Sequence, residues 1–256
     1  MRFILALLSF LVVGCSSQQK LVRLSEQTLP KTTYISVSGT MQTVVLKFDG
    51  KSTYSFEATT VPVRVQGAGV YISENNHVLT CSHLFELLTI SSVTVCDYDG
   101  SCYETEILFR EPNLDLALLR TNSSGRSSPI RLADPRKTRV GQEVYAIGTP
   151  LGFPFSVSHG IISAMNRDQL GVYNMIQSDT FLNPGNSGGG LFNMDGELIG
   201  INSRIVPPVN ASIFTGLGFS VDSGQIIEFL TRFRGLDKNI PKYGSDYWSS
   251  LFRSED

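Results

Sequence analysis

Asn183-Pro184-Gly185-Asn186-Ser187-Gly188-Gly189-Gly190 is a glycine-dense segment with one serine at its centre and strand-like residues on both sides. A serine hydroxyl is a weak nucleophile until a base removes its proton and amides stabilise the resulting oxyanion. Glycines on either side allow backbone turns in which successive N–H groups point at one spot. The segment indicates a nucleophilic serine, although by itself it also fits a plain turn.

A base for such a serine must come from one of three histidines. His83 ends the apolar run Val78–His83, where a strand presents a side chain at a domain edge. His77 lies beside Asn75 and Asn76 in a turn, so we expect it to be solvated. His159 lies within an apolar strand, where a structural role is expected. His83 is therefore the candidate base.

An acid that orients this base should be a carboxylate that can be buried. Asp115 stands between Leu114 and Leu116 in an apolar segment, whereas most other acids occupy obvious turns. A buried carboxylate is costly unless it is paired, and a histidine N–H would pair it. Asp115 is the candidate, with a turn-capping aspartate at the start of a strand as the alternative.

Short apolar or alternating runs separated by turn signals recur along the chain, which favours a β-sandwich or barrel. One amphipathic helix is predicted at Ser223–Arg234, with Asp222 or Ser223 as its N-cap and Gly235 as its stop. A short helical turn is expected at residues 84–88. The predicted strands are Met41–Phe48, Thr53–Ala58, Gly69–Ser73, His77–Thr80, Val93–Asp97, Tyr103–Phe109, Leu116–Arg120, Glu143–Ile147, Val157–Ala164, Val172–Gln177, Gly190–Asn193, Glu197–Ser203 and Thr215–Val221.

The composition limits the function classes. The 256 residues carry a net charge of −2 and form no basic patch, so no nucleic-acid partner is expected. No cluster has zinc-ligand spacing, and we expect neither a metal nor a cofactor. Cys96 and Cys102 flank an Asp-Gly turn and could form a local disulfide or remain two thiols. Cys81 is expected to be a small buried side chain.

The N-terminal sequence indicates a targeting segment. Arg2 precedes an apolar run from Phe3 to Val13, which is shorter than the about 20 residues that span a bilayer. The run ends at Gly14-Cys15 and resembles a bacterial lipobox, which predicts a signal peptide over residues 1–14 and a lipid on Cys15. The alternative is an ordinary signal peptide. Residues 15–31 are then a polar tether, and Ser16 favours the outer membrane, facing the periplasm.

The order His83, Asp115, Ser187 is that of the chymotrypsin family, and the surrounding motifs resemble its HtrA (Deg) branch. The resemblance covers roughly Thr33 to Arg234, and it implies an all-β, chymotrypsin-like pair of six-stranded β-barrels with a C-terminal helix and the site between the barrels. The protease domain is then residues 32–234, followed by a tail at 235–256. The matching motifs are Leu79–His83, Asn113–Leu119, Ala146–Gly152, Gly160–Ala164, Ile176–Asp179, Asn183–Gly189, Ile199–Asn202 and Gly216–Ser220.

The resemblance assigns roles to the three side chains. It makes Ser187 the nucleophile, His83 the general base and Asp115 the group that orients the imidazole. The amides of Gly185 and Ser187 would form the oxyanion hole. Asn186 stands where trypsin-like digestive enzymes have an aspartate that pairs with a new N-terminal amine, so we expect no activation by N-terminal cleavage.

The resemblance also predicts specificity. No carboxylate stands where trypsin selects lysine or arginine, so cleavage is expected after small or medium apolar residues, in misfolded or partly unfolded proteins. A homotrimer is compatible with the family. Residues 235–256 are too few for a PDZ domain, and the stretch Lys47–Val63 is either an interaction hairpin or an insertion. The predicted pocket residues are Phe181, Leu182, Ser203, Gly216 and Gly218.

Two functions from different classes fit this reading. The first is a lipid-anchored serine endopeptidase of the cell envelope, which acts without a cofactor on polypeptide substrates. The second is a catalytically silent protein-binding module on the same fold. An α/β-hydrolase esterase is a third and weak interpretation, because that fold needs alternating helices and strands and the order serine, acid, histidine, and neither is present.

Overall fold

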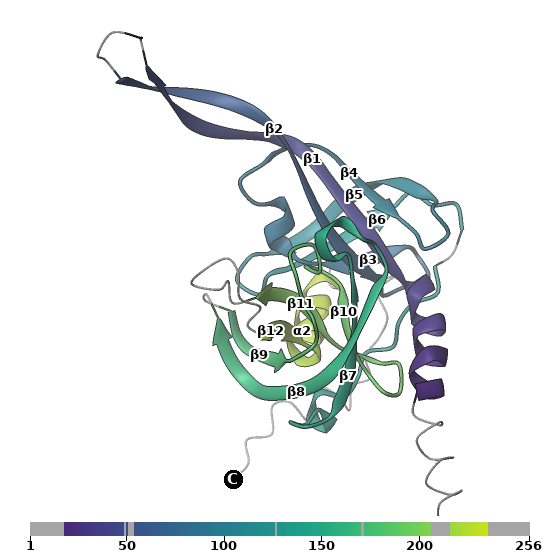
Figure 1. Ribbon diagram of the computed structural model, residues 1–256. Coiled ribbons are helices and arrows are strands. Elements are labelled where there is room, and N and C mark those ends of the chain that lie inside the picture. Colours follow the sequence, from purple (N-terminus) through teal and green to yellow (C-terminus); the bar gives the residue numbers. More distant parts are fainter. Residues whose placement is uncertain are drawn as a thin grey trace, which may run out of the picture.

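The computed structural model describes residues 18–48, 50, 54–125, 127–169, 172–205 and 216–234, which form two closed antiparallel β-barrels of six strands each (Figure 1). The predicted chymotrypsin-like fold is thereby confirmed. The first barrel has the order β1-β2-β3-β6-β5-β4, and the second has the order β10-β11-β12-β9-β8-β7. The first contains β1 (Thr32–Phe48), β2 (Tyr54–Tyr71), β3 (His77–Thr80), β4 (Thr89–Cys96), β5 (Cys102–Glu111) and β6 (Leu116–Thr121). The second contains β7 (Glu143–Gly148), β8 (Ser156–Gln169), β9 (Val172–Ser178), β10 (Gly190–Asn193), β11 (Leu198–Ile205) and β12 (Gly218–Asp222).

Burial follows the strand period in the first barrel. Ile35 and Val37 of β1 are fully buried, while their neighbours are only partly buried. The four residues of β3 are buried on both faces, and the strand pairs with β2 on one side and β6 on the other. Closing the sheet leaves this barrel without an open edge. A rigid β3 can therefore hold whatever follows it in a fixed position.

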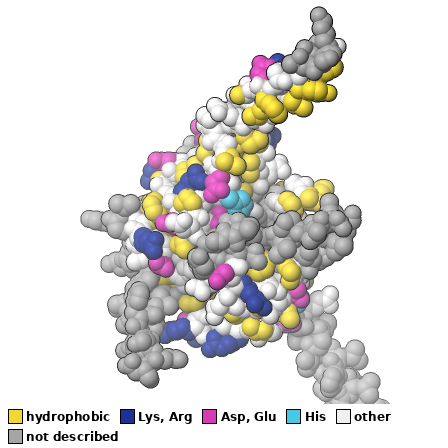
Figure 2. Space-filling view, turned by 90° about the vertical axis from the view of Figure 1, so that its left-hand side faces the viewer, with side chains coloured by type: hydrophobic (Ala, Val, Ile, Leu, Met, Phe, Trp, Pro, Cys, Tyr) yellow, Lys and Arg dark blue, Asp and Glu magenta, His cyan; other side chains and the backbone are white. Residues whose placement is uncertain are grey.

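Strands β1 and β2 continue past the barrel as a long two-stranded arm (Figure 1). Their register runs without interruption from Thr32 opposite Val70 to Phe48 opposite Tyr54. The rings of Phe48 and Tyr54 lie 5.0 Å apart, and the arm carries apolar side chains on one face (Figure 2). The predicted strands near residues 41–58 are thus the outer half of two much longer strands, and the described residues of Lys47–Val63 belong to this arm.

Helix α2 (Ser223–Arg234) confirms the predicted helix and joins the two barrels. Asp222 caps it, since its Oδ1 accepts a hydrogen bond of 2.8 Å from the Gln225 N–H. The rings of Phe229 and Phe233 lie 5.5 and 5.8 Å from the ring of Phe109 in β5. Helix α2 thus contacts β11 and β12 of the second barrel, and its phenylalanine rings also reach the first barrel.

Residues 18–28 form a helix that packs on the second barrel, so the tether prediction is wrong from residue 18 onward. Leu24 is buried, and Thr28 Oγ1 lies 2.9 Å from the hydroxyl of Tyr145 in β7. Lys20 pairs with Asp195 at 3.7 Å in the β10–β11 turn. The helix continues into the 3₁₀ turn η1 (Leu29–Lys31), which leads into β1.

The predicted signal peptide, Cys15 and the tail at 235–256 lie outside the described residues. Within the part that is described, no helix is both long and apolar enough to cross a bilayer. The structure joins Cys96 to Cys102 in a disulfide at the β4–β5 turn.

His77 is buried, which overturns the expectation that it is solvated. Its Nδ1 lies 2.7 Å from the hydroxyl of Ser73, so the turn between β2 and β3 folds over the imidazole and supplies a polar partner. The imidazole is therefore part of the barrel wall and is not exposed to solvent. His159, in contrast, is exposed on β8.

Candidate active site

His83 is presented by the 3₁₀ turn η2 (Ser82–Phe85), which follows the buried strand β3. The Ser82 N–H donates to the Asp115 carbonyl at 3.2 Å, which ties the turn to the start of β6. The Arg110 guanidinium donates to the carbonyls of Ser82 and Phe85 at 3.1 and 3.3 Å and closes the other side. The imidazole is thus held by backbone contacts, while about 30% of the side chain stays exposed in the cleft.

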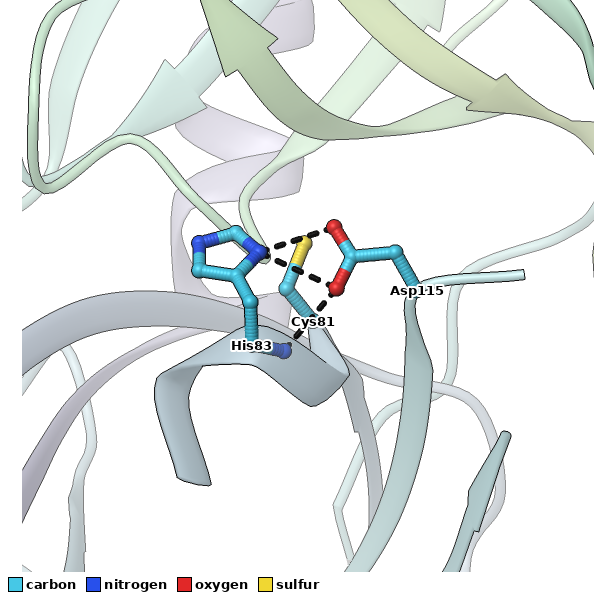
Figure 3. A group of neighbouring side chains, drawn as sticks. All are labelled: Cys81, His83 and Asp115. Atoms are coloured by element: carbon cyan, nitrogen blue, oxygen red, sulfur yellow. Dashed lines mark hydrogen bonds and ion pairs between the residues drawn. The ribbon is translucent and has the colours of Figure 1, made fainter. Parts of the chain in front are cut away.

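Asp115 lies beside the Nδ1 edge of this imidazole and is only 1% exposed (Figure 3). Its φ of 54° is left-handed, a conformation that aspartate tolerates better than most residues. Oδ1 accepts the His83 backbone N–H at 2.9 Å, and Oδ2 lies 2.8 Å from His83 Nδ1. The Ser203 hydroxyl donates a further hydrogen bond to Oδ2.

These contacts set the protonation of the Asp115 carboxyl. Burial alone raises its pKa, but the hydrogen bond and charge of His83 and the hydrogen bond of Ser203 outweigh burial. The net pKa of Asp115 lies below its usual value. The carboxylate is therefore ionised at neutral pH and accepts the proton that Nδ1 carries.

Ser187 reaches the same imidazole from the second barrel. Its Oγ lies 3.0 Å from His83 Nε2. The Ala68 N–H of β2 donates to the Ser187 carbonyl at 2.8 Å, so the serine loop is bonded directly to the first barrel. The Gly188 N–H donates to the Asn202 carbonyl at 2.8 Å in β11. Asp115, His83 and Ser187, the three residues predicted from sequence, form one hydrogen-bonded line between the barrels.

Gly185 has a φ of 100°, and a Cβ there would collide with the Thr149 carbonyl, so only glycine fits this position. The Pro184 carbonyl accepts the Leu151 N–H at 2.9 Å. Because a trans peptide points its C=O and N–H in opposite directions, the Gly185 N–H faces away from Leu151. Among the described residues, neither the Gly185 nor the Ser187 amide has a protein acceptor. Both N–H groups are thus available to an oxygen atom.

A cavity of about 210 Å³ opens beside Ser187. Leu182 and Ser203, both predicted for a pocket, line it, and none of the described residues that line it is charged. Gly218 packs against Leu182 at the cavity wall. The structure places Phe181 instead at a neighbouring cavity of about 170 Å³, half-exposed, and Gly216 lines neither of these two cavities.

Ser203 has a second contact that sequence reasoning missed. The sequence predicts only a pocket position for it, but its hydroxyl donates to Asp115 Oδ2 while its carbonyl accepts from Ser187 Oγ at 3.4 Å. A lone serine at the end of an apolar strand carries no sequence signal for this contact, because the partner carboxylate lies far away in the chain.

Cys81 is buried and outside any disulfide, which confirms the expectation of a small buried side chain. Its thiol donates to the Asn202 carbonyl at 3.2 Å. The sulfur lies beside His83 and Asp115, so a third type of ligand atom is present at the base of the site (Figure 3).

The fold and this arrangement define a class of protein, a two-barrel hydrolase with a serine, histidine and aspartate in its cleft. The model of the trypsin-like peptidase domain family matches residues 67–201, which is more than half of the chain, and the chain belongs to this family. The match includes all three of these residues.

The chain is similar to several bacterial proteases. It is 36% identical over 182 residues to the periplasmic serine endoprotease DegP of Escherichia coli K12. The aligned residues cover 70% of this chain and 36% of DegP. It is 36% identical over 186 residues to the periplasmic pH-dependent serine endoprotease DegQ of the same organism, covering 68% of this chain and 40% of DegQ. DegP of Salmonella typhimurium is 35% identical over 182 residues, with 70% and 36% covered. The chain thus spans little more than a third of the length of these relatives. Their similarity supports the resemblance to the HtrA branch.

Proposed function

We propose that this chain is a serine endopeptidase of the HtrA type, in which Ser187 attacks the peptide carbonyl. The observation that carries the proposal is the hydrogen-bonded line from Asp115 through His83 to Ser187, with its 2.8 and 3.0 Å contacts. Such a line is what an activated serine needs, since the hydroxyl proton has an acceptor and that acceptor is oriented by a buried carboxylate.

The mechanism follows from the positions of these atoms. His83 Nε2 takes the proton as Ser187 Oγ bonds the carbonyl carbon, and it then gives the proton to the leaving amine. Asp115 holds the Nδ1–H and stabilises the imidazolium. The amides of Gly185 and Ser187 stabilise the oxyanion. Water activated by His83 then hydrolyses the acyl-enzyme.

The cavity beside Ser187 supports cleavage after small or medium apolar residues. Its described lining consists of Leu182, Pro184 and uncharged polar groups, and none of these offers a lysine or arginine side chain a charged partner. Burial of a charge without a partner is costly, whereas an apolar side chain gains from leaving water. Polypeptides that expose apolar segments, as misfolded proteins do, are the substrate class that this pocket suits.

Asn186 supports activity without proteolytic activation. Its side chain is buried, and its Nδ2 donates to the Phe181 carbonyl at 3.4 Å. An uncharged amide at this position needs no buried ammonium group as a counter-ion. The chain would therefore be active without a newly cut N-terminus.

The cell envelope is the proposed location, and the lipobox-like sequence at Gly14-Cys15 supports an anchor there. The names of the relatives place those proteins in the periplasm. If Cys15 carries the lipid, the packed helix at residues 18–28 begins three residues later and would hold the catalytic domain close to the bilayer.

A catalytically silent binding module is the alternative, and an unfolded protein substrate separates the two. A reduced and alkylated protein is incubated with the wild type and with Ser187→Ala, and the fragments are sequenced by mass spectrometry. The proposal expects cleavage by the wild type alone, mostly after valine, alanine or leucine. Binding without cleavage by both proteins would favour the module, and frequent cleavage after lysine or arginine would contradict the proposed specificity.

A further inference from the structure

Three different metal-binding groups meet at the base of the active site. The Cys81 sulfur, the His83 imidazole and the Asp115 carboxylate each offer an atom, and these atoms all lie within 4.8 Å of one another. Figure 3 shows the sulfur projecting between the imidazole and the carboxylate. Cys81 directly follows strand β3 and is the N-cap residue of η2, two residues before His83, so the same backbone positions both side chains. The proposed peptidase mechanism uses the histidine and the aspartate but gives the thiol no part.

Nitrogen, sulfur and oxygen donors in this number suit zinc(II). Zinc binds thiolate, imidazole and carboxylate with tetrahedral geometry, and its usual bond lengths place neighbouring donor atoms about 3.4–3.6 Å apart. His83 Nδ1 and Asp115 Oδ2 are 2.8 Å apart, so they would separate by less than about 1 Å to admit the ion. The sulfur, at up to 4.8 Å from the others, would move inward by a similar amount.

We propose that Cys81, His83 and Asp115 form an inhibitory zinc(II) site inside the catalytic cleft. On binding, the thiol loses its proton to solvent and forms a Zn–S bond. The imidazole proton leaves Nδ1, which forms a Zn–N bond, and Nε2 becomes protonated. The carboxylate exchanges its contact with Nδ1 for the metal. One proton is released in total, and no atom changes oxidation state.

The inhibition follows from the tautomer. With Nδ1 bound to zinc, Nε2 carries the proton and cannot accept the one on Ser187 Oγ, which lies 3.0 Å away. The serine then has no base. This effect on activity rests on the proposed peptidase function, whereas zinc binding itself does not.

The exposure of the three side chains determines how a zinc ion reaches the site. Cys81 is fully buried and Asp115 nearly so, while the His83 side chain is about 30% exposed. Of these three described side chains the imidazole alone is partly exposed, so an ion would enter along it. Without the sulfur, an imidazole and a carboxylate alone bind zinc weakly, so the thiol decides the affinity.

The first test is a zinc titration of peptidase activity, with each variant compared with its own activity in a chelator. We expect zinc to inhibit the wild type reversibly and Cys81→Ala to need at least tenfold more zinc. His159→Gln removes an exposed imidazole elsewhere and should behave as the wild type. Cys81→Ser, which keeps the side-chain size, repeats the test should the alanine variant unfold. Equal inhibition of the wild type and the folded Cys81 variants would overturn the proposal.

The release of one proton makes the binding depend on pH. The zinc concentration for half inhibition should fall up to about tenfold for each pH unit while the thiol is protonated in the metal-free protein. Inhibition through an exposed imidazole would persist in Cys81→Ala. A pH dependence of inhibition that is the same in the wild type and in folded Cys81→Ala would contradict the site.

The second test does not need activity. Cobalt(II) bound to a thiolate gives a charge-transfer absorption in the near ultraviolet, so the wild type and Ser187→Ala should both show it and Cys81→Ala should not. A protein that binds cobalt in this way yet cleaves nothing would support the metal site and contradict the peptidase. An active protein without the band would contradict the metal site alone.

Discussion

Replacing Asp115 by asparagine changes the charge beside His83 and almost nothing in size. Oδ1 accepts the His83 backbone N–H at 2.9 Å, so the amide oxygen of the asparagine must lie there to avoid two facing donors. The NH₂ group then occupies the position of Oδ2, which faces His83 Nδ1 and the Ser203 hydroxyl. It donates to Nδ1, which forces the proton onto Nε2.

The loss of kcat can be estimated from this change of tautomer. An imidazole with its proton on Nε2 cannot take the proton of Ser187, and a change of this kind in a serine triad lowers kcat about 10⁴-fold. At about 1.36 kcal/mol for each tenfold change, the loss of transition-state stabilisation is about 5.5 kcal/mol. KM should change little, because Asp115 does not line the cavity beside Ser187.

The same substitution changes the pH dependence of stability. The folded-state pKa of Asp115 is lowered, so its ionised form stabilises the fold. This contribution is complete above the unfolded pKa of about 3.9 and is lost as the pH falls through the lower folded-state pKa. The difference in unfolding free energy between the wild type and Asp115→Asn should therefore be full at pH 7 and shrink below about pH 4, as measured by urea denaturation.

Steady-state hydrolysis of a peptide with valine before the scissile bond measures the kinetic effect. Ser187→Ala gives the background rate. Asp134→Asn, which removes a surface carboxylate paired with Arg136, is the matched control and should keep the wild-type kcat. A folded Asp115→Asn protein with less than a tenfold loss of kcat would refute the claim that Asp115 sets the tautomer of His83.

Three further changes test the oxyanion loop, the N-terminal helix and the helix cap. Gly185→Ala forces a side chain into a left-handed position against the Thr149 carbonyl. The loss of one oxyanion donor should lower kcat about 10²–10³-fold, and an unchanged kcat would show that this amide is not used. Leu24→Ala should lower the unfolding free energy by about 2–3 kcal/mol, because the side chain is buried. Lys20→Ala, at an exposed ion pair, should lower it by less than about 1 kcal/mol. Equal effects of the two variants in urea denaturation would contradict the packing of the helix. Asp222→Ala removes the cap of α2 and should cost about 1 kcal/mol in the same assay, and no loss would argue against the cap.

Features with a strong local signal could be predicted from the sequence. Helix α2 has an apolar stripe, an aspartate cap and a following glycine, and it begins and ends at the predicted residues. The strand pairs around Asp-Gly turns were also predictable, because alternation and turn chemistry agree there. The three side chains of the site were found because each residue type is unusual in its surroundings.

Features that depend on distant partners could not be predicted. The helix at residues 18–28 buries few apolar side chains, and its partner Tyr145 lies far along the chain. His77 looked solvated because the hydroxyl of Ser73 that satisfies it belongs to a turn whose closure is not visible in the sequence. The contact of Ser203 with Asp115 joins two barrels and has no local pattern.

The length of the β1–β2 arm was also missed. The turn near Asp49-Gly50 was predicted, but the sequence gives no sign that strands near residues 41–58 continue unbroken into the barrel. Pro62 lies inside β2, and a proline in a strand usually argues for an end or an edge. In this protein it lies opposite Thr40, where the arm leaves the barrel.

The most direct test of the central claim is covalent labelling of Ser187 by a fluorophosphonate, read by intact mass and peptide mapping. Ser187 Oγ should be reactive because His83 Nε2 lies 3.0 Å away and the Gly185 and Ser187 amides can receive the phosphoryl oxygen. The account predicts one adduct, located on Ser187, absent from Ser187→Ala and strongly reduced in Asp115→Asn. A folded wild-type protein that gives no adduct, with or without an added unfolded polypeptide, would contradict it.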